Sequence, residues 1–206
     1  MQSLKYYLDK TSEHHDHLCP RQVLGVRMGL AGISVLGLPP EQTGKRLLII
    51  LECDGCFVDG VSAVTGCTVG HRTLCVEDYG KTAVTFVDTE LGKAVRISPR
   101  IDLREQAILA EAEEPDHYQA MLKAYQVLPD VDMFIMNEVQ LHERISSLVS
   151  QPGMRVSCES CGEEIMNERE INAGGKILCL PCAGKSYCSI GEVVSPENQF
   201  SAKVND

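Results

Sequence analysis

The end of the chain carries two pairs of cysteines with the spacing of a tetrahedral metal site. Cys158 and Cys161 form one Cys-x-x-Cys pair, and Cys179 and Cys182 form a second pair seventeen residues later. Two such pairs, each held in a tight turn, complete the four-thiolate shell of structural zinc. A segment this short cannot bury enough surface to fold alone, so zinc would supply the missing free energy, ~10–16 kcal/mol in zinc-finger peptides. A redox dithiol pair and a rubredoxin-like iron site are the alternatives.

A second group of metal-ligand residues lies near the N-terminus, where residues 14–20 read His-His-Asp-His-Leu-Cys-Pro. His15, His17 and Cys19 alternate, so in an extended segment their side chains project to the same side. Pro20 suits the first position of a helix, which would place Cys19 at the helix N-terminus, where a thiolate is favoured. The pattern indicates half of a metal site. The alternative is a partly exposed loop whose histidines bond to its own backbone.

Composition excludes several classes of protein. The formal net charge is -10 with no cluster of Lys and Arg, so we do not expect a nucleic-acid partner. No apolar run resembles a signal sequence or a membrane span, and we therefore expect a cytoplasmic protein. In that reducing compartment the ten cysteines are metal ligands or reactive thiols rather than disulfides.

The order of the predicted elements favours an α+β fold. Gly25, Gly29 and Gly32 lie on adjoining turns of a long apolar helix, which indicates close approach by another element. The whole pattern predicts a mixed or antiparallel sheet with packed helices, plus a small C-terminal zinc-finger domain. We expect helices at 3–12, 20–37, 59–65, 103–114 and 116–128, strands at 45–52, 81–87, 93–97 and 134–141, a hairpin turn at 88–92, a linker at 146–153, and domains at 1–149 and 150–206.

Three further motifs lie in the central part of the chain: Cys56-x-x-Asp59, Thr65-Gly-Cys67-Thr, and Asp78-Tyr-Gly-Lys81. Together with the His15-x-His17-x-Cys19-Pro turn, over roughly residues 10–141, they resemble the FmdE family, named for formylmethanofuran dehydrogenase. The four-cysteine segment resembles a zinc finger of the DnaK-suppressor type.

The resemblance implies an α+β core, usually an intertwined homodimer, with a second divalent metal, Zn²⁺ or another transition metal. Matched by position, His17, Cys19 and Cys56 are the leading core ligands, with His15 as the fourth. Asp16 and Arg21 stand where the family usually carries glycine, and Asp16 could orient an imidazole. Residues to which the sequence assigns no role are Cys53, Cys67, Cys75, His71 and Cys188; for Cys67, a buried packing role is an equal alternative.

Two functions follow as hypotheses. The first is a metalloenzyme or a component associated with a redox enzyme, in which an open core metal site binds substrate or water and oxidoreductase subunits are the partners. The second is a metal or cofactor carrier, or a regulatory protein, whose zinc finger docks a partner without turnover. The sequence does not name a substrate.

Overall fold

The computed structural model describes residues 2–13, 15, 17–142 and 153–191. The chain divides into two compact units, Met1–Ser150 and Gln151–Asp206. Most of the predicted linker at 146–153 lies outside the described residues. No helix within the described ranges combines the length and the apolar character needed to cross a membrane.

The first unit is built on a five-stranded mixed sheet in the order β2-β1-β3-β4-β5. Strand β1 pairs in parallel with β2, and the other neighbours are antiparallel. The predicted α+β class is therefore confirmed. The strands are β1 (Leu47–Leu51), β2 (Leu74–Val76), β3 (Val84–Asp88), β4 (Lys93–Pro99) and β5 (Phe134–Glu138).

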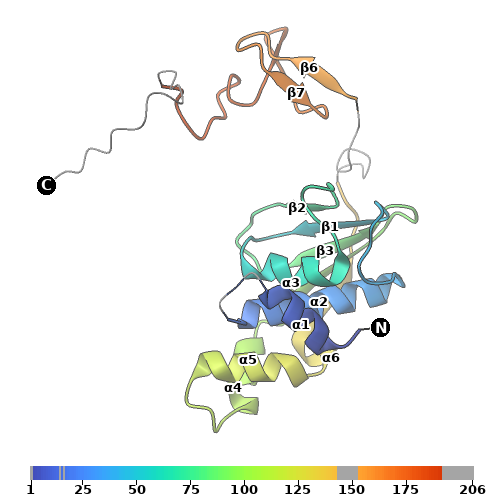
Figure 1. The fold of residues 1–206 in the computed structure, drawn as a ribbon, viewed down its shortest axis with the longest axis vertical. Coiled ribbons are helices and arrows are strands. Elements are labelled where there is room, and N and C mark those ends of the chain that lie inside the picture. The colour runs from blue at the N-terminus through green and yellow to red at the C-terminus, as the bar shows by residue number, and fades with distance from the viewer. Residues whose placement is uncertain (1, 14, 16, 143–152, 192–206) are drawn as a thin grey trace, which may run out of the picture. The chain divides into compact units, whose positions relative to one another are not determined.

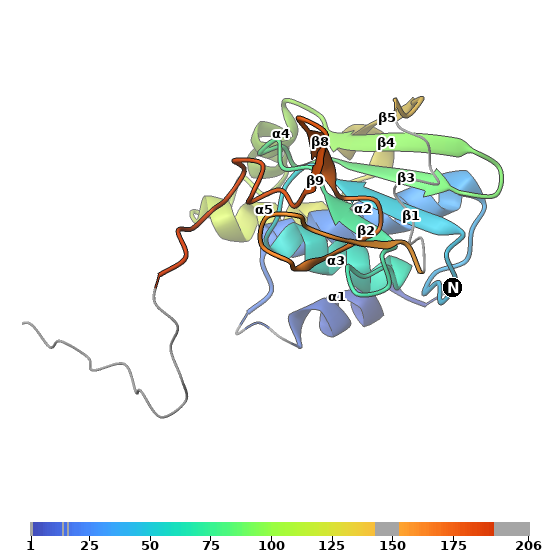
Figure 2. The same ribbon diagram turned by 90° about the horizontal axis from the view of Figure 1, so that it is seen from above.

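Helices cover one face of this sheet (Figure 1). They are α1 (Leu4–Ser12), α2 (Pro20–Leu36), α3 (Cys56–Thr65), α4 (Leu103–Ala110), α5 (His117–Val127) and α6 (Asp130–Met133). Seen from above, the strands lie over α2 and α3, with α4 and α5 together at one end (Figure 2). The core between sheet and helices includes Ile49, Phe57, Phe86 and Ile97, each at most 1% exposed.

Glycines set the close packing of α2 against its neighbours, as the sequence predicts. A Cβ added at Gly25 would fall on the carbonyl oxygen of Phe57 in α3, and one at Gly32 would fall on the ring of Phe86. Gly60 meets α2 in the same way, against the carbonyl oxygen of Gln22. The two helices therefore cross with their backbones in contact.

Several element boundaries differ from those predicted. Helix α3 begins at Cys56 rather than Asp59, because Gly55 at φ 81° turns the chain directly after the loop. Helix α4 ends at Ala110, and β5 ends at Glu138 instead of continuing to residue 141. The structure also contains β2 and α6, which the sequence did not predict.

The second unit consists of two short hairpins. Strand β6 (Arg155–Ser157) pairs with β7 (Glu164–Met166), and β8 (Ile171–Ala173) pairs with β9 (Lys176–Leu178), both antiparallel. Among its described residues only Cys158 and Ile165 are buried apolar side chains, so this unit has almost no hydrophobic core.

Candidate metal centres

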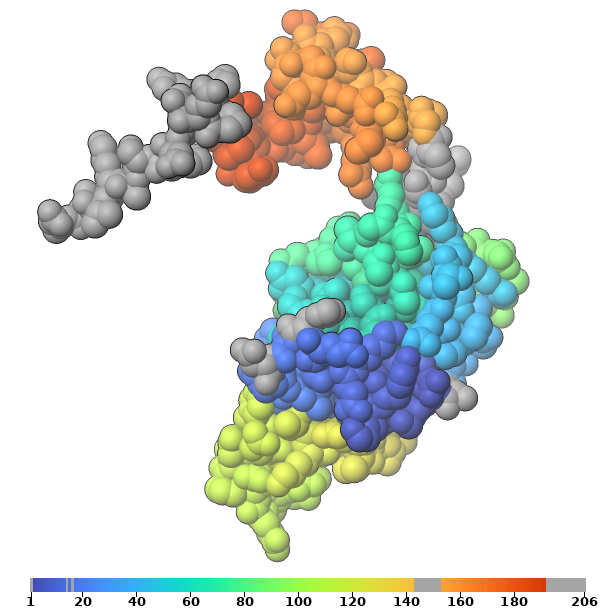
Figure 3. Space-filling view, viewed as in Figure 1, coloured from blue at the N-terminus to red at the C-terminus, as the bar shows by residue number. Residues whose placement is uncertain are grey.

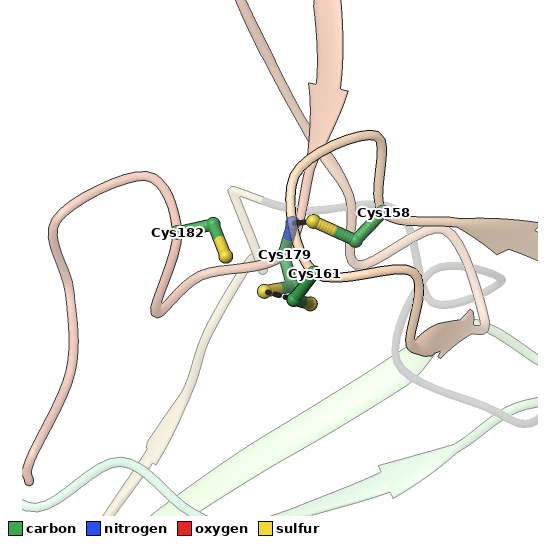
Figure 4. A group of neighbouring side chains, drawn as sticks. All are labelled: Cys158, Cys161, Cys179 and Cys182. Atoms are coloured by element: carbon green, nitrogen blue, oxygen red, sulfur yellow. Dashed lines mark hydrogen bonds between the residues drawn. The ribbon is translucent and has the colours of Figure 1, made fainter. Parts of the chain in front are cut away.

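The four cysteines of the second unit converge on one point. Cys158 and Cys161 lie in the turn after β6, and Cys179 and Cys182 lie in the turn after β9. Their four sulfur atoms all lie within 4.8 Å of one another (Figure 4). This is the arrangement that a tetrahedral thiolate site requires.

The two turns that carry these cysteines have the same backbone geometry. The amide of Gly162 donates to the Cys158 carbonyl at 2.9 Å, and the amide of Ala183 donates to the Cys179 carbonyl at 2.9 Å. Gly162 has φ 80°, which only glycine adopts without strain. Each turn therefore presents its two sulfurs to the same side.

Backbone amides also prepare one thiol for binding. Hydrogen bonds from the backbone at Cys161 and then at Cys179 lower the pKa of Cys158 to about 6. The Cys179 amide lies 3.3 Å from the Cys158 sulfur (Figure 4). Cys158 is therefore a thiolate at neutral pH, the form that binds a metal.

In the first unit, the start of α2 and the start of α3 bring two thiols together. Cys19 is the N-cap of α2, where its sulfur accepts a hydrogen bond from the Gln22 amide and the Gln22 side chain accepts one from the Cys19 amide. Cys56 is the first residue of α3. Burial raises the pKa of Cys56, and the hydrogen bond and charge of the neighbouring Cys19 thiol raise it further. The sequence-predicted pairing of these two cysteines in space is thus found in the structure.

The histidine turn lies beside this thiol pair without closing a site. His15 Nε2 lies 2.9 Å from the Asp59 carboxylate, one helical turn after Cys56, while His17 is exposed. Within the part of the chain that the structure describes, the cysteines of the second unit are the one group of three or more candidate ligand atoms within 4.8 Å. His14 and Asp16 lie outside the described residues.

The remaining cysteines and His71 take different positions. Cys67 is 1% exposed and its thiol approaches the Leu47 carbonyl oxygen at 3.5 Å, so it packs in the core. Cys75 lies in β2 and lines a cavity on the sheet face away from the helices. Cys53 is half-buried, and His71 and Cys188 are exposed.

A small cavity adjoins Cys19, and sequence reasoning missed most of the residues around it. Tyr118, Met121 and Tyr125 on α5 line it, together with Leu24 on α2. Their spacing along α5 is i, i+3, i+7, a pattern that by itself indicates only a helix face packed on a core. The phenol of Tyr118 lies close enough to the thiols that, after burial, the charges of Cys19 and Cys56 raise its pKa.

The two cysteine sets differ in what they can do chemically. Four sulfurs around one point leave no open coordination position, which suits a structural ion. Two thiols beside a cavity, with imidazole and carboxylate groups nearby, leave space for a ligand. The fold and these sets define an α+β metal-binding protein with a zinc finger at its C-terminal side.

Comparison with known families narrows this class. Residues 14–135 match the family described as "FmdE, Molybdenum formylmethanofuran dehydrogenase operon", and residues 154–188 match the "Prokaryotic dksA/traR C4-type zinc finger". The chain belongs to the FmdE family and carries a C4-type zinc finger, as the sequence motifs predict.

Two relatives show how far the likeness extends. A crystal structure of a tungsten formylmethanofuran dehydrogenase FmdE-like protein from Syntrophus aciditrophicus is 25% identical, with a TM-score of 0.58, covering 91% of this chain and 96% of that chain. A protein of Archaeoglobus fulgidus named "Probable S-adenosyl-L-methionine-binding protein" is 29% identical over 205 residues, which is 88% of this chain and 54% of that protein. The chain thus spans about half the length of this curated relative.

Proposed function

We propose that the first unit binds a second divalent metal, Zn²⁺ or another transition metal, between the starts of α2 and α3. Cys19, Cys56 and His17 are its proposed ligands, with His15 as the fourth. The observation that carries this proposal is the pairing of the Cys19 and Cys56 thiols, which come from distant parts of the sequence.

The surroundings of the thiol pair fit such an ion. Thiolate and imidazole are the ligands that borderline divalent metals prefer. Asp59 contacts Nε2 of His15 and leaves Nδ1 to face an ion, the usual pairing of a carboxylate with a metal-bound histidine. Exposed His17, two residues before Cys19, would move in to complete the set.

A metal held by three protein ligands supplies a Lewis acid with an open position for substrate or water. On this basis we propose that the chain is a metalloenzyme or a metal-binding component of a formylmethanofuran dehydrogenase-like oxidoreductase. Membership of the FmdE family and the cavity beside Cys19 support this role.

Replacing Cys56 with serine tests the site. We expect Cys56→Ser to lower the metal content from about two ions to one per chain, because one core thiolate is lost while the four-cysteine zinc remains. Elemental analysis of the purified full chain measures this. Cys188→Ser, which removes an exposed cysteine outside both sets, is the matched control. Equal metal content in Cys56→Ser and the unaltered protein would remove Cys56 from the site.

The second candidate function is a metal or cofactor carrier, or a regulatory protein, whose zinc finger docks a partner. A cavity of about 450 Å³ on the sheet face away from the helices favours it, since it is large enough for a cofactor. The cavity is lined by Glu77 and Tyr79, a carboxylate and an aromatic ring of the kind that holds a sulfonium or ammonium cation. The name of the Archaeoglobus fulgidus relative supports S-adenosyl-L-methionine as the ligand.

Two measurements separate these functions. A carrier should release its core ion to a competing chelator much faster than an enzyme would. Calorimetric titration with S-adenosyl-L-methionine should give saturable binding that Glu77→Gln weakens, whereas the same substitution at Glu113, an exposed residue outside the cavity, should not. Absence of binding would contradict the cofactor-carrier function.

We further propose a homodimer, and oxidoreductase subunits as partners, in the cytoplasm. Apolar side chains exposed on the edge strand β5, Ile135 at 44% and Met136 at 37%, support a second copy as partner. Free thiols in both candidate centres support a reducing compartment. Light scattering on the full chain tests the dimer.

A further inference from the structure

A cavity of about 220 Å³ lies between the first turn of α2 and the pair of helices α4 and α5. Cys19 and Arg21 line it from α2, Arg104 from α4, and Tyr118 and Met121 from α5. The α4–α5 pair lies at one end of the first unit, beyond α2 (Figures 1 and 3). The cavity therefore joins the proposed metal site to a separate structural layer of the same unit.

Two guanidinium groups at this cavity are not neutralised. Arg27, Arg46 and Arg96 form ion pairs with Asp130, Asp88 and Glu52. Among the described residues, Arg21 and Arg104 make no hydrogen bond or ion pair with a carboxylate, and no carboxylate lines the cavity. In a chain with a net charge of -10, such a cationic cavity is a local exception.

The rest of the lining is apolar or aromatic. Leu24, Met121 and the rings of Tyr118 and Tyr125 form the walls. The volume is below the ~300–1,000 Å³ of pockets that hold drug-sized ligands, so the occupant is compact. A guanidinium matches the two oxygens of a carboxylate with two parallel hydrogen bonds.

We propose that this cavity binds a small organic carboxylate, with its anionic group on Arg21 and Arg104 and its apolar body toward Cys19. The inference rests on the proposed function, because it names the class of molecule that would meet the core metal. It assigns Arg21 and Arg104 the role of binding residues. Tyr118, which lies between the cations and the thiol pair, forms the wall along which the ligand reaches the site.

Paired carboxylates and amides of the same shape test the proposal. The full metal-loaded chain is titrated with acetate, butyrate and benzoate, and with acetamide, butyramide and benzamide, and binding is followed by NMR. We expect saturable binding of at least one carboxylate and none of its amide. Arg21→Gln and Arg104→Gln should each weaken that binding about tenfold or more, the equivalent of one charge-assisted hydrogen bond.

Arg72→Gln is the matched control. Strands β1 and β2 are parallel, so Arg72, just before β2, lies at the opposite end of this pair from Cys53, which follows β1. This variant loses the same charge and should keep full affinity. Both cavity arginines are exposed, so their removal should leave the melting temperature unchanged.

Each outcome decides one question. Equal binding of acid and amide, no binding of any carboxylate, or equal affinity in all three variants would overturn the carboxylate site. Binding of phenyl phosphate with no binding of benzoate would overturn it as well. Metal content measured on the same samples reports on the core ion separately: two ions per chain without carboxylate binding contradicts only this inference, and one ion per chain with carboxylate binding contradicts only the proposed function.

Discussion

The carboxylate of Asp88 organises the turn between β3 and β4. Its side chain is 1% exposed, and Arg46 lies 2.9 Å away. One carboxylate oxygen also accepts hydrogen bonds from the amides of Glu90 and Leu91, at 3.0 and 3.1 Å. The hydrogen bond from Arg46 is the main cause that holds the pKa of Asp88 below its ordinary value, against the opposing effect of burial.

This environment makes the stability of the first unit depend on pH. Because the folded-state pKa of Asp88 is lowered, its contribution is fully present above the unfolded value of ~3.9 and is lost as the pH falls through the folded value. We expect Asp88→Asn to lower the free energy of unfolding by about 2 kcal/mol at pH 7, the value of a hydrogen bond to a charged group. Urea denaturation at several pH values measures this, and the variant should lose less stability on acidification.

Glu90→Gln provides the control for Asp88→Asn. Glu90 also faces Arg46, at 3.3 Å, but its side chain is 65% exposed. Exposed ion pairs contribute little, so this variant should differ from the unaltered protein by less than about 0.5 kcal/mol. Equal effects of the two substitutions would show that burial of Asp88 is not what matters.

At the scale of single residues, the sequence predicted the chemistry better than the contacts. Pro20 predicts the start of α2, and with it the position of Cys19 as the N-cap, because both are local properties of the chain. The spacing of the two Cys-x-x-Cys pairs predicts their convergence for the same reason. Arg21 and Arg104 form one cavity only after α2 and α4 are placed, and no local pattern reports that.

At the scale of elements, the contact between α2 and α3 depends on glycine at the crossing. Gly25 on α2 and Gly60 on α3 each face the backbone of the other helix, with no room for a Cβ. We expect Gly25→Ala to destabilise the first unit by about 1–3 kcal/mol, because the added methyl group pushes the helices apart. This exceeds the roughly 1 kcal/mol by which alanine favours a helix over glycine. Thermal or urea denaturation measures the difference.

Gly44→Ala is the matched substitution. An added Cβ at Gly44 meets nothing within 4 Å. Its φ is not positive, so alanine is tolerated there and should change stability by less than about 0.5 kcal/mol. A Gly25→Ala variant as stable as Gly44→Ala would contradict the close crossing.

The elements that the sequence missed are short or depend on distant partners. Strand β2 has three residues, and its pairing with β1 forms only in the folded sheet. Helix α4 ends earlier than apolar spacing predicts, since residues 111–114 contain three glutamates, and negative charge disfavours a helix C-terminus. Longer elements with a clear apolar face, such as α2 and α5, were predicted within a residue of their observed ends.

At the scale of the molecule, the two units have different sources of stability. The first buries a continuous core between sheet and helices, while the described part of the second buries only Cys158 and Ile165 as apolar side chains. The second unit must therefore depend on its ion, which is worth ~10–16 kcal/mol in zinc-finger peptides.

Removal of zinc should consequently unfold the second unit alone. We expect Cys158→Ser in the full chain to lose the dispersed amide NMR signals of residues 153–191 and to keep the signals of the sheet. Cys56→Ser should give the reverse outcome for the ions, with the second unit intact. Loss of the sheet signals in Cys158→Ser would show that the first unit cannot stand without the second.

The capping of α2 by Cys19 has a consequence for how the core could be observed. The sulfur proposed to hold an ion is also the acceptor for the amide of Gln22, at 3.4 Å. Whatever engages that sulfur, whether an ion, an alkylating reagent or an oxidant, competes with this amide for the same lone pairs. Solvent exchange at the amide of Gln22 would therefore act as a built-in gauge of occupancy, readable without a spectroscopically active metal and without knowledge of the substrate.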